Sequence, residues 1–348
     1  MKSEGLTQIA DSLTKFIGYP IDYLQTTRLL RQIHIATGCK NYCTHCFANP
    51  SQDVRQMSIS SFSKISTEIG KAVNKLGERI PFLFLGSETD PSMVENFAKY
   101  IEIYDKTQPI YVPITIFSHG WDLRNEYQKK ELDYLCKIYN KAKKSKTQKR
   151  PWKIVLSYDS FNIFARESWE TYLINLKDNI ILLREHFPVN LINFEVYYPL
   201  DAPDSRSPDR ISYWTKLCEV PIANNDIPNS DNISSNITLG IFWILREAGI
   251  EHKSFFTNIW DCGKPFKSGR AHKLYGNSMD EINQDALQYQ RTRVLYRLEN
   301  LPDKFFGIML YPNGSVRTVN YLGYIPGDWL SNGEKVVSYV EEAKHGSF

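Results

Sequence analysis

The stretch from residue 30 to residue 47 reads LRQIHIATGCKNYCTHCF and joins an apolar run directly to three cysteines. Its first seven residues are rich in Leu, Ile and Ala, a composition typical of a buried strand. Cys39, Cys43 and Cys46 follow with the spacing C-x3-C-x2-C, and no fourth cysteine stands nearby. The pattern predicts a strand that leads into a loop of closely spaced thiols.

Three cysteines in one short loop indicate metal binding. Three thiolates can hold three irons of a four-iron cluster and leave the fourth iron open. A zinc site is the alternative, with His45 as a fourth ligand beside the same cysteines. His45 directly precedes Cys46, however, which crowds four ligands into one loop, and no second ligand pair follows downstream. A disulfide is the third interpretation, and cysteine spacing alone does not exclude it. We expect a [4Fe–4S] cluster on Cys39, Cys43 and Cys46.

The cysteine spacing, the preceding strand and the histidine before the last cysteine resemble the radical S-adenosylmethionine (radical SAM) enzymes. The resemblance implies that the open iron binds the amino and carboxylate groups of S-adenosylmethionine (SAM). One electron from the reduced cluster then cleaves SAM to methionine and a 5′-deoxyadenosyl radical. The cluster and SAM are therefore the expected cofactors, and a protein such as flavodoxin or ferredoxin is the expected reducing partner.

Composition limits the class of protein. The chain has 348 residues, of which 42% are hydrophobic, enough for a sizeable core. A net charge of +3 does not favour a dedicated nucleic-acid binder. The N-terminal residues lack the pattern of a signal peptide, and no apolar run has the length of a membrane span. We expect a cytoplasmic protein without a membrane partner.

Short β-rich runs alternate with longer helical patterns, which predicts parallel strands joined by helical crossovers. The resemblance implies the partial (β/α)6 barrel of radical SAM enzymes, within the α/β class, followed by a C-terminal α+β extension. Helix 58–76 would be capped by Ser60 or Ser61. The expected strands are residues 30–36, 80–85, 114–117, 153–159, 191–197 and 305–310, and the expected helices are residues 58–76, 91–105, 124–143 and 168–186.

The expected domain organisation has four parts. Residues 1–28 form a helical preface, and residues 29–200 form the barrel core. Residues 201–258, which begin with a long stretch rich in Pro, Asp, Asn and Ser, form an insertion and a helix. A long loop inside a compact domain is usually functional or disordered, and this one is a candidate substrate lid. Residues 259–348 form the C-terminal extension.

Several polar residues follow the expected strands, where parallel barrels carry their active sites. Gly86, Ser87 and Glu88 occupy the place of the segment that binds the SAM amino group in radical SAM enzymes, although Ser87 replaces a glycine. His119 is expected to be a supporting or packing residue. The resemblance assigns further SAM-binding positions to Ser118, Ser157, Asp159, Arg166 and His45.

The C-terminal extension is similar to the SPASM and twitch regions of radical SAM relatives, which hold auxiliary clusters. Its Pro312-Asn313-Gly314-Ser315 sequence predicts a hairpin turn. Cys262 is the one cysteine near this region, so we expect a degenerate extension that holds no cluster. Cys262 itself is a candidate hydrogen-atom donor to a substrate radical, and a buried, inert cysteine is the alternative.

The sequence therefore predicts a radical SAM enzyme that abstracts hydrogen from a peptide or another natural-product precursor. A small sugar or nucleoside is the alternative substrate. A zinc-binding interaction protein is the alternative from another class. Repair of a DNA lesion is a further interpretation, prompted by residues 87–91 and by the basic run at residues 141–150. A solvated helix end with favourable cations at its C-terminus explains that run more simply.

Overall fold

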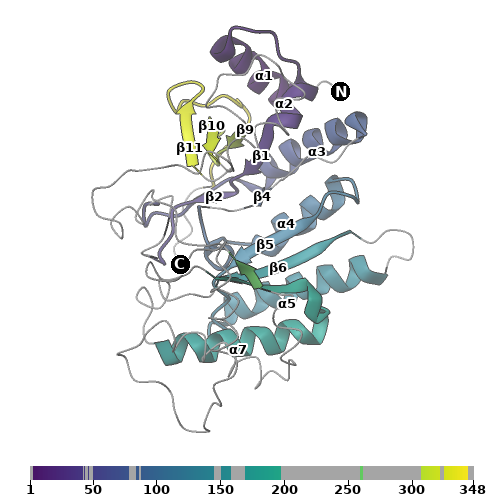
Figure 1. Ribbon diagram of the computed structural model, residues 1–348, viewed down its shortest axis with the longest axis vertical. Helices are drawn as coiled ribbons and strands as arrows, with labels where there is room; N and C mark the ends of the chain where they lie inside the picture. Colours follow the sequence, from purple (N-terminus) through teal and green to yellow (C-terminus); the bar gives the residue numbers. More distant parts are fainter. Residues whose placement is uncertain are drawn as a thin grey trace, which may run out of the picture.

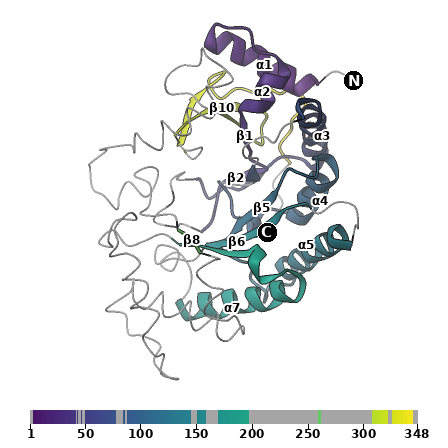
Figure 2. The ribbon, with the colours of Figure 1, turned by 45° about the vertical axis from the view of Figure 1, so that its right-hand side comes forward.

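The computed structural model has a mixed α/β fold, shown in Figures 1 and 2. It describes residues 3–41, 43, 46, 50–77, 84–85, 88–144, 150–157, 169–196, 259–261, 307–321 and 325–343. In Figure 2, helices α3, α4, α5 and α7 follow one another along one side of the molecule, with the strands on their inner side.

The elements alternate between strand and helix through most of the described chain. The helices are α1 (Glu4–Ile17), α2 (Tyr23–Leu29), α3 (Ile59–Leu76), α4 (Phe97–Thr107), α5 (Glu126–Lys144) and α7 (Trp169–His186), with 3-10 turns η1 (Pro91–Met93) and η2 (Val189–Leu191). The strands are β1 (Leu30–Ile33), β2 (Ala36–Thr37), β3 (Arg55–Gln56), β4 (Phe84–Leu85), β5 (Ile114–Ser118), β6 (Trp152–Ser157), β7 (Ile192–Val196), β8 (Ile259–Asp261), β9 (Gly307–Leu310), β10 (Val316–Tyr321) and β11 (Ile325–Trp329).

Two larger sheets contain most of these strands. One has the order β11-β10-β9-β1-β4, and β1 is parallel to both β4 and β9. The other is fully parallel, with the order β5-β6-β7-β8. Strands β4 and β5 contact each other although they share no ladder. The parallel pairs confirm the prediction from alternation, because parallel neighbours require a crossover. Among the described residues, α3 lies between β1 and β4, α5 between β5 and β6, and α7 between β6 and β7.

Three of the expected strands are confirmed as β5, β6 and β7, and the expected helices near 58–76, 124–143 and 168–186 are confirmed as α3, α5 and α7. The predicted strand 30–36 is divided. Its first part is β1, whereas Ala36 and Thr37 leave that sheet and pair with Gln56 and Arg55 as β2. The predicted helix 91–105 is likewise divided into η1 and α4, because Val94–Asn96 interrupt it and Asn96 has a positive φ of 56°.

The predicted strand at 305–310 is present as β9, but it does not follow β7 in its sheet. It pairs with β1 on the edge opposite β4, and the neighbour of β7 is β8, which sequence periodicity did not identify. A three-residue strand is too short to produce a periodic signal of its own. The predicted hairpin is confirmed: β9 and β10 are antiparallel neighbours, and Gly314 between them has a φ of +83°.

Helix α3 shows how local sequence sets an element. Its cap is Ser58, whose side chain accepts a hydrogen bond from the Ser61 N–H, so the predicted cap at Ser60 or Ser61 was wrong by two to three positions. The Ser61 hydroxyl instead donates to the Tyr339 carbonyl. The helix ends at Gly77, whose φ of +64° suits glycine. Its buried face carries Phe62, Ile65, Ile69 and Val73 at helical spacing.

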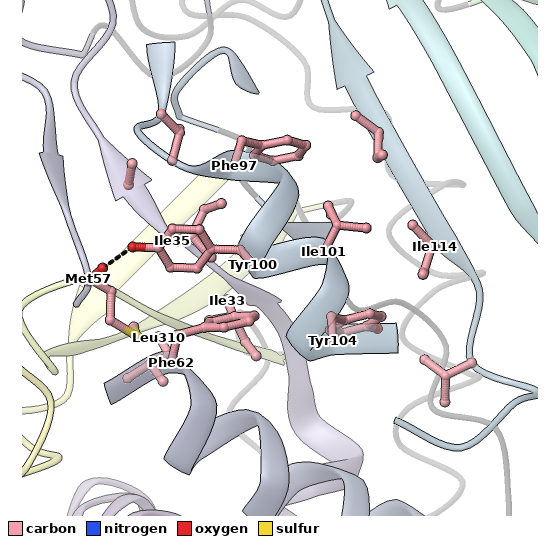
Figure 3. Packing of buried hydrophobic residues seen from close by; sticks show 14 of the residues in the cluster. Ile33, Ile35, Met57, Phe62, Phe97, Tyr100, Ile101, Tyr104, Ile114 and Leu310 are labelled. Carbon is pink, nitrogen blue, oxygen red and sulfur yellow. Dashed lines mark hydrogen bonds between the residues drawn. The ribbon is translucent and has the colours of Figure 1, made fainter. Parts of the chain in front are cut away.

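The core packs α3 and α4 against β1 and β5 (Figure 3). The ring of Phe62 on α3 meets the ring of Tyr100 on α4 edge to face, with centroids 5.1 Å apart. The Tyr100 hydroxyl donates a hydrogen bond to the Met57 carbonyl, shown as a dashed line in Figure 3. Tyr100 thus links α4 to the residues that precede α3 while its ring fills the core.

The C-terminal segment returns to the beginning of the chain. Ser58 N–H donates to the Glu341 carbonyl at 2.7 Å, and Ala343 N–H donates to the Gln56 carbonyl at 2.7 Å. The Tyr339 hydroxyl donates to the Glu68 carboxylate on α3 at 3.0 Å. Residues more than 250 positions apart in sequence therefore share one structural unit. Within the described residues, no helix combines the length and apolar character needed to cross a membrane.

Candidate functional site

The cysteine loop begins where β2 ends. None of Cys39, Cys43 and Cys46 forms a disulfide; Cys43 is buried, and the other two are partly exposed. Cys39 N–H donates to the Ser51 carbonyl at 2.7 Å, which joins the two ends of the loop. Gly38 has a φ of +86°, and a Cβ there would collide with the carbonyl oxygen of Asp53. The loop therefore closes because the residue before its first cysteine has no side chain.

The loop is held by residues at the ends of β4 and β5. Thr89, four residues beyond β4, donates through its hydroxyl to the Gly38 carbonyl at 2.8 Å. Cys43 Sγ lies 3.3 Å from Nε2 of His119, the first residue after β5. Polar residues were predicted to lie together at the strand ends. The contacts of Thr89 and His119 with the cysteine loop agree with this prediction at the ends of β4 and β5.

Asp90 is the centre of these contacts, and its side chain is only 1% exposed. Its Oδ1 accepts from the Ser92 N–H at 2.9 Å and from the Ser118 hydroxyl at 3.0 Å. Its Oδ2 accepts from the His119 N–H at 2.7 Å and lies 2.6 Å from His119 Nδ1. Asn41, in the cysteine loop, also donates to Oδ2 at 3.4 Å. Buried carboxylates need such partners, and Asp90 has them from three parts of the chain.

Asp90 was not singled out from the sequence. The available signal was Asp90 directly before Pro91, since Asp is a common cap and Pro is favoured at the first helical position. This pair does begin η1. The signal locates a turn, however, and says nothing of a bond to a histidine that lies 29 residues further along the chain.

His119 lies between Asp90 and Cys43. Burial lowers the pKa of His119, but the charges of Cys43 and Asp90 and the hydrogen bonds to both outweigh burial and hold that pKa well above its usual value. Burial raises the pKa of the Cys39 thiol. Asp90, His119 and Cys43 are in contact one after another, so this part of the site can carry a positive charge on His119 beside the Cys43 sulfur.

Glu88 has a partner that no sequence pattern indicated. The Tyr311 hydroxyl, directly after β9, donates to Glu88 Oε1 at 2.9 Å. The Tyr311 ring stacks on His34 with centroids 4.7 Å apart. His34 is buried, and its Nε2 lies 3.2 Å from Met309 Sδ. Burial lowers the pKa of His34, although the Glu88 charge opposes this effect.

Of the other predicted site residues, the structure describes Ser118 and Ser157. Ser118 is buried, and its hydroxyl donates to Asp90. Ser157, at the end of β6, is also buried, and its backbone pairs with Glu195 of β7. The predicted residues Gly86, Ser87, His45, Asp159, Arg166 and Cys262 lie outside the described residues.

The donor groups of the loop fit an iron–sulfur cluster. Three cysteines that form no disulfide stand on one loop, and the loop is anchored to two strand ends. Within the described part of the chain, no three Cys, His, Asp or Glu side chains form a group that could hold a metal ion. A cluster presents a separate iron to each thiolate, so its ligands need not converge on one point as zinc ligands do.

The chain matches no protein-family model, no curated protein and no solved structure.

Proposed function

We propose that this chain is a radical SAM enzyme with a [4Fe–4S] cluster on Cys39, Cys43 and Cys46. The observation that carries the proposal is the attachment of the cysteine loop to the ends of two strands, through Thr89 to Gly38 and through His119 to Cys43. Strand ends are where parallel α/β folds assemble their active sites, because successive loops meet there. The cysteine spacing is suited to binding the cluster, and the strand ends place the loop where parallel α/β folds form their active sites.

The order of parallel strands supports a partial (β/α)6 barrel. Strands β1 and β4 are parallel neighbours, β4 contacts β5, and β5, β6, β7 and β8 continue in chain order. Five of these strands correspond to strands expected within residues 29–200, whereas β8 stands in the place of the sixth strand, which was expected at residues 305–310. We include β8 in the proposed barrel, so that β9 to β11 belong to the C-terminal extension.

When bound, a reduced cluster would supply the electron that cleaves SAM to methionine and a 5′-deoxyadenosyl radical. The chain itself would hold and orient the reactants. Glu88 offers a carboxylate for the SAM amino group, and Ser157 offers a hydroxyl at the end of β6. Asp90 holds His119 against Cys43. The radical would take a hydrogen atom from a peptide or natural-product precursor and leave 5′-deoxyadenosine, with a sugar or nucleoside as the alternative substrate.

A second function is favoured by one specific observation. Cys43 Sγ lies 3.3 Å from His119 Nε2, and His119 Nδ1 lies 2.6 Å from Asp90 Oδ2. Thiol, imidazole and carboxylate in this order also form the arrangement of nucleophilic cysteine catalysis. The two functions differ in their need for Cys39 and Cys46, because a cluster requires all three thiolates and a nucleophile requires Cys43 alone.

The deciding experiment is anaerobic reconstitution with iron and sulfide, followed by an assay for 5′-deoxyadenosine with SAM and a strong reductant. Single alanine variants of Cys39, Cys43 and Cys46 are compared with Cys136→Ala, which removes a buried thiol on α5. We expect about four irons per chain in the wild type, as a [4Fe–4S] cluster requires. We also expect deoxyadenosine formation to be lost in each loop variant and kept in Cys136→Ala.

Other outcomes identify the alternatives. Zinc in the purified protein, with no iron uptake, would support the zinc-binding interaction protein. Full iron loading without SAM cleavage, either alone or with added peptides and nucleosides, would contradict the proposal. A thiol-directed reagent that inactivates the protein through Cys43, with Cys39→Ala and Cys46→Ala fully active, would support the nucleophilic cysteine.

A further inference from the structure

We infer that Tyr311 is a positioning residue for Glu88, so that the last part of the chain completes the SAM site formed near its beginning. The inference rests on the proposed function, in which Glu88 binds the SAM amino group. It assigns a role to the C-terminal extension that does not require an auxiliary cluster.

Strand topology places the two residues at one edge of the sheet. Strand β1 lies between β4 and β9 and is parallel to both, so the carboxyl ends of all three strands lie at the same edge. Glu88 follows β4 after two residues, and Tyr311 follows β9 directly. Their side chains meet beyond the end of β1, where the hydroxyl donates to Glu88 Oε1 at 2.9 Å.

The Tyr311 hydroxyl is held in a fixed position. The ring is buried and stacks on His34, with an angle of 22° between the ring planes. The ring of Trp329, from β11, lies 4.9 Å away on a tilted plane. Tyr311 N–H also donates to the Ser315 carbonyl within the hairpin. A donor held in this way loses little conformational entropy when it binds Glu88.

The properties of the Tyr311 hydroxyl suit a partner of a carboxylate that binds a cation. Burial, together with the charge of Glu88 and the hydrogen bond to it, raises the pKa of Tyr311, so the phenol keeps its proton and acts as a donor. The hydroxyl is neutral, and it orients Glu88 without cancelling its charge. Among the described residues, Tyr311 is the one side chain that donates a hydrogen bond to this carboxylate. In the proposed site, Oε2 accepts from a primary ammonium group such as that of SAM.

The test compares two Tyr→Phe changes that remove the same kind of bond. Tyr311→Phe removes the hydroxyl that reaches Glu88 and keeps the stacked ring. Tyr339→Phe removes a hydroxyl that donates to the Glu68 carboxylate on α3 at 3.0 Å. SAM affinity is measured by titration calorimetry on the cluster-loaded protein without reductant. Iron content and the thermal midpoint are recorded for each variant.

We expect Tyr311→Phe to weaken SAM binding by roughly tenfold, the effect of one well-placed hydrogen bond to a charged group. Iron content should not change, and Tyr339→Phe should bind SAM as the wild type does. The deciding measurement introduces Tyr311→Phe into a Glu88→Gln protein. If Tyr311 acts through Glu88, Tyr311→Phe should have no further effect on SAM affinity once the carboxylate is gone.

Two results would overturn the inference alone. One is a Tyr311→Phe protein with wild-type SAM affinity. The other is an equal loss from Tyr311→Phe in the wild-type and Glu88→Gln backgrounds, which would indicate a general structural effect. If the loaded wild-type protein binds no SAM, the proposed function fails as well, and this result is visible before any variant is made.

Discussion

Asp90 and His119 are joined twice through one oxygen atom. The His119 N–H donates to Asp90 Oδ2 at 2.7 Å, and His119 Nδ1 lies 2.6 Å from the same atom. The backbone bond fixes where the histidine stands, and the ring contact fixes which nitrogen faces Cys43. One carboxylate, 1% exposed, therefore sets both the place and the orientation of the imidazole.

Asp90→Ala is predicted to destabilise the protein strongly. It leaves the Ser92 N–H, the Ser118 hydroxyl and the His119 N–H without their acceptor in a buried place. We expect the free energy of unfolding to fall by about 3 kcal/mol, as for other broken buried networks. Urea denaturation measures the change. Asp122→Ala is the control, because Asp122 pairs with an exposed Arg124, and its loss should cost under about 1 kcal/mol. Equal losses in both variants would contradict this role for Asp90.

Gly38→Ala is predicted to open the cysteine loop. A Cβ would collide with the Asp53 carbonyl oxygen, and the φ of +86° disfavours any side chain. Gly18→Ala is a matched control, since Gly18 has a φ of +74° and nothing within 4 Å of the added Cβ. We expect a loss of about 1 kcal/mol at Gly18, from the backbone conformation alone. The loss at Gly38 should be at least twice as large.

Iron uptake distinguishes the two glycine variants further. Reconstitution should load Gly18→Ala as fully as the wild type, whereas Gly38→Ala should retain less iron, because the displaced loop carries Cys39. Full iron loading of Gly38→Ala would show that loop closure at this residue is not needed for the cluster.

Arg150→Met is predicted to loosen the connection between α4 and β5. The Arg150 side chain is 4% exposed and pairs with Asp105 at 2.8 Å. It also donates to the backbone carbonyls of Asp105, Gln108, Pro109 and Val112. Without it these acceptors and one carboxylate are unpaired, and we expect a loss of about 3 kcal/mol. Thermal denaturation is the measurement. Arg124→Met, at an exposed ion pair, should leave the midpoint nearly unchanged.

Acid stability is predicted to depend on Glu102. Hydrogen bonds from Lys106 and Lys99 lower its pKa from 4.5 to about 2. Because the pKa is lower in the folded state, the carboxylate stabilises the fold above pH 4.5, and this contribution is lost as pH falls from there toward 2. The free energies of unfolding of the wild type and Glu102→Gln, measured at pH 7, 4 and 3, should therefore converge as pH falls. Glu126→Gln, which removes one carboxylate from an exposed pair with Lys130, is the matched variant.

Local elements were largely predictable from the sequence. Helix α3 follows from apolar residues at helical spacing that end at Gly77, and the β9–β10 turn follows from Pro312 to Ser315. Errors appeared where a local pattern was interrupted by a tertiary contact. Strand β1 was predicted to continue to Ala36, but Ala36 pairs with Gln56 in another sheet. Ser58 caps α3, and the hydroxyl of Ser61, one of the expected caps, donates to the C-terminal segment instead.

The candidate site was predictable only in part. Cysteine spacing identified Cys39, Cys43 and Cys46, and the expected strand ends pointed to Glu88 and Ser118. Neither Asp90 nor Tyr311 was identified. Both act through partners far along the chain, 29 residues away for Asp90 and 223 for Tyr311. The residues that flank a side chain in the sequence do not determine such a distant partner, since many folds are compatible with the same local pattern.

Local sequence was enough to predict the alternation of strands and helices and the loop of three thiols, because hydrophobic period, caps and turn residues act over a few positions. The pairing of β9 with β1 instead of β7, and with it the contact of Tyr311 with Glu88, depends on how the whole chain packs. Strand pairing depends on which surfaces can be buried together across the whole chain. The residues that meet at a strand end are a consequence of that packing.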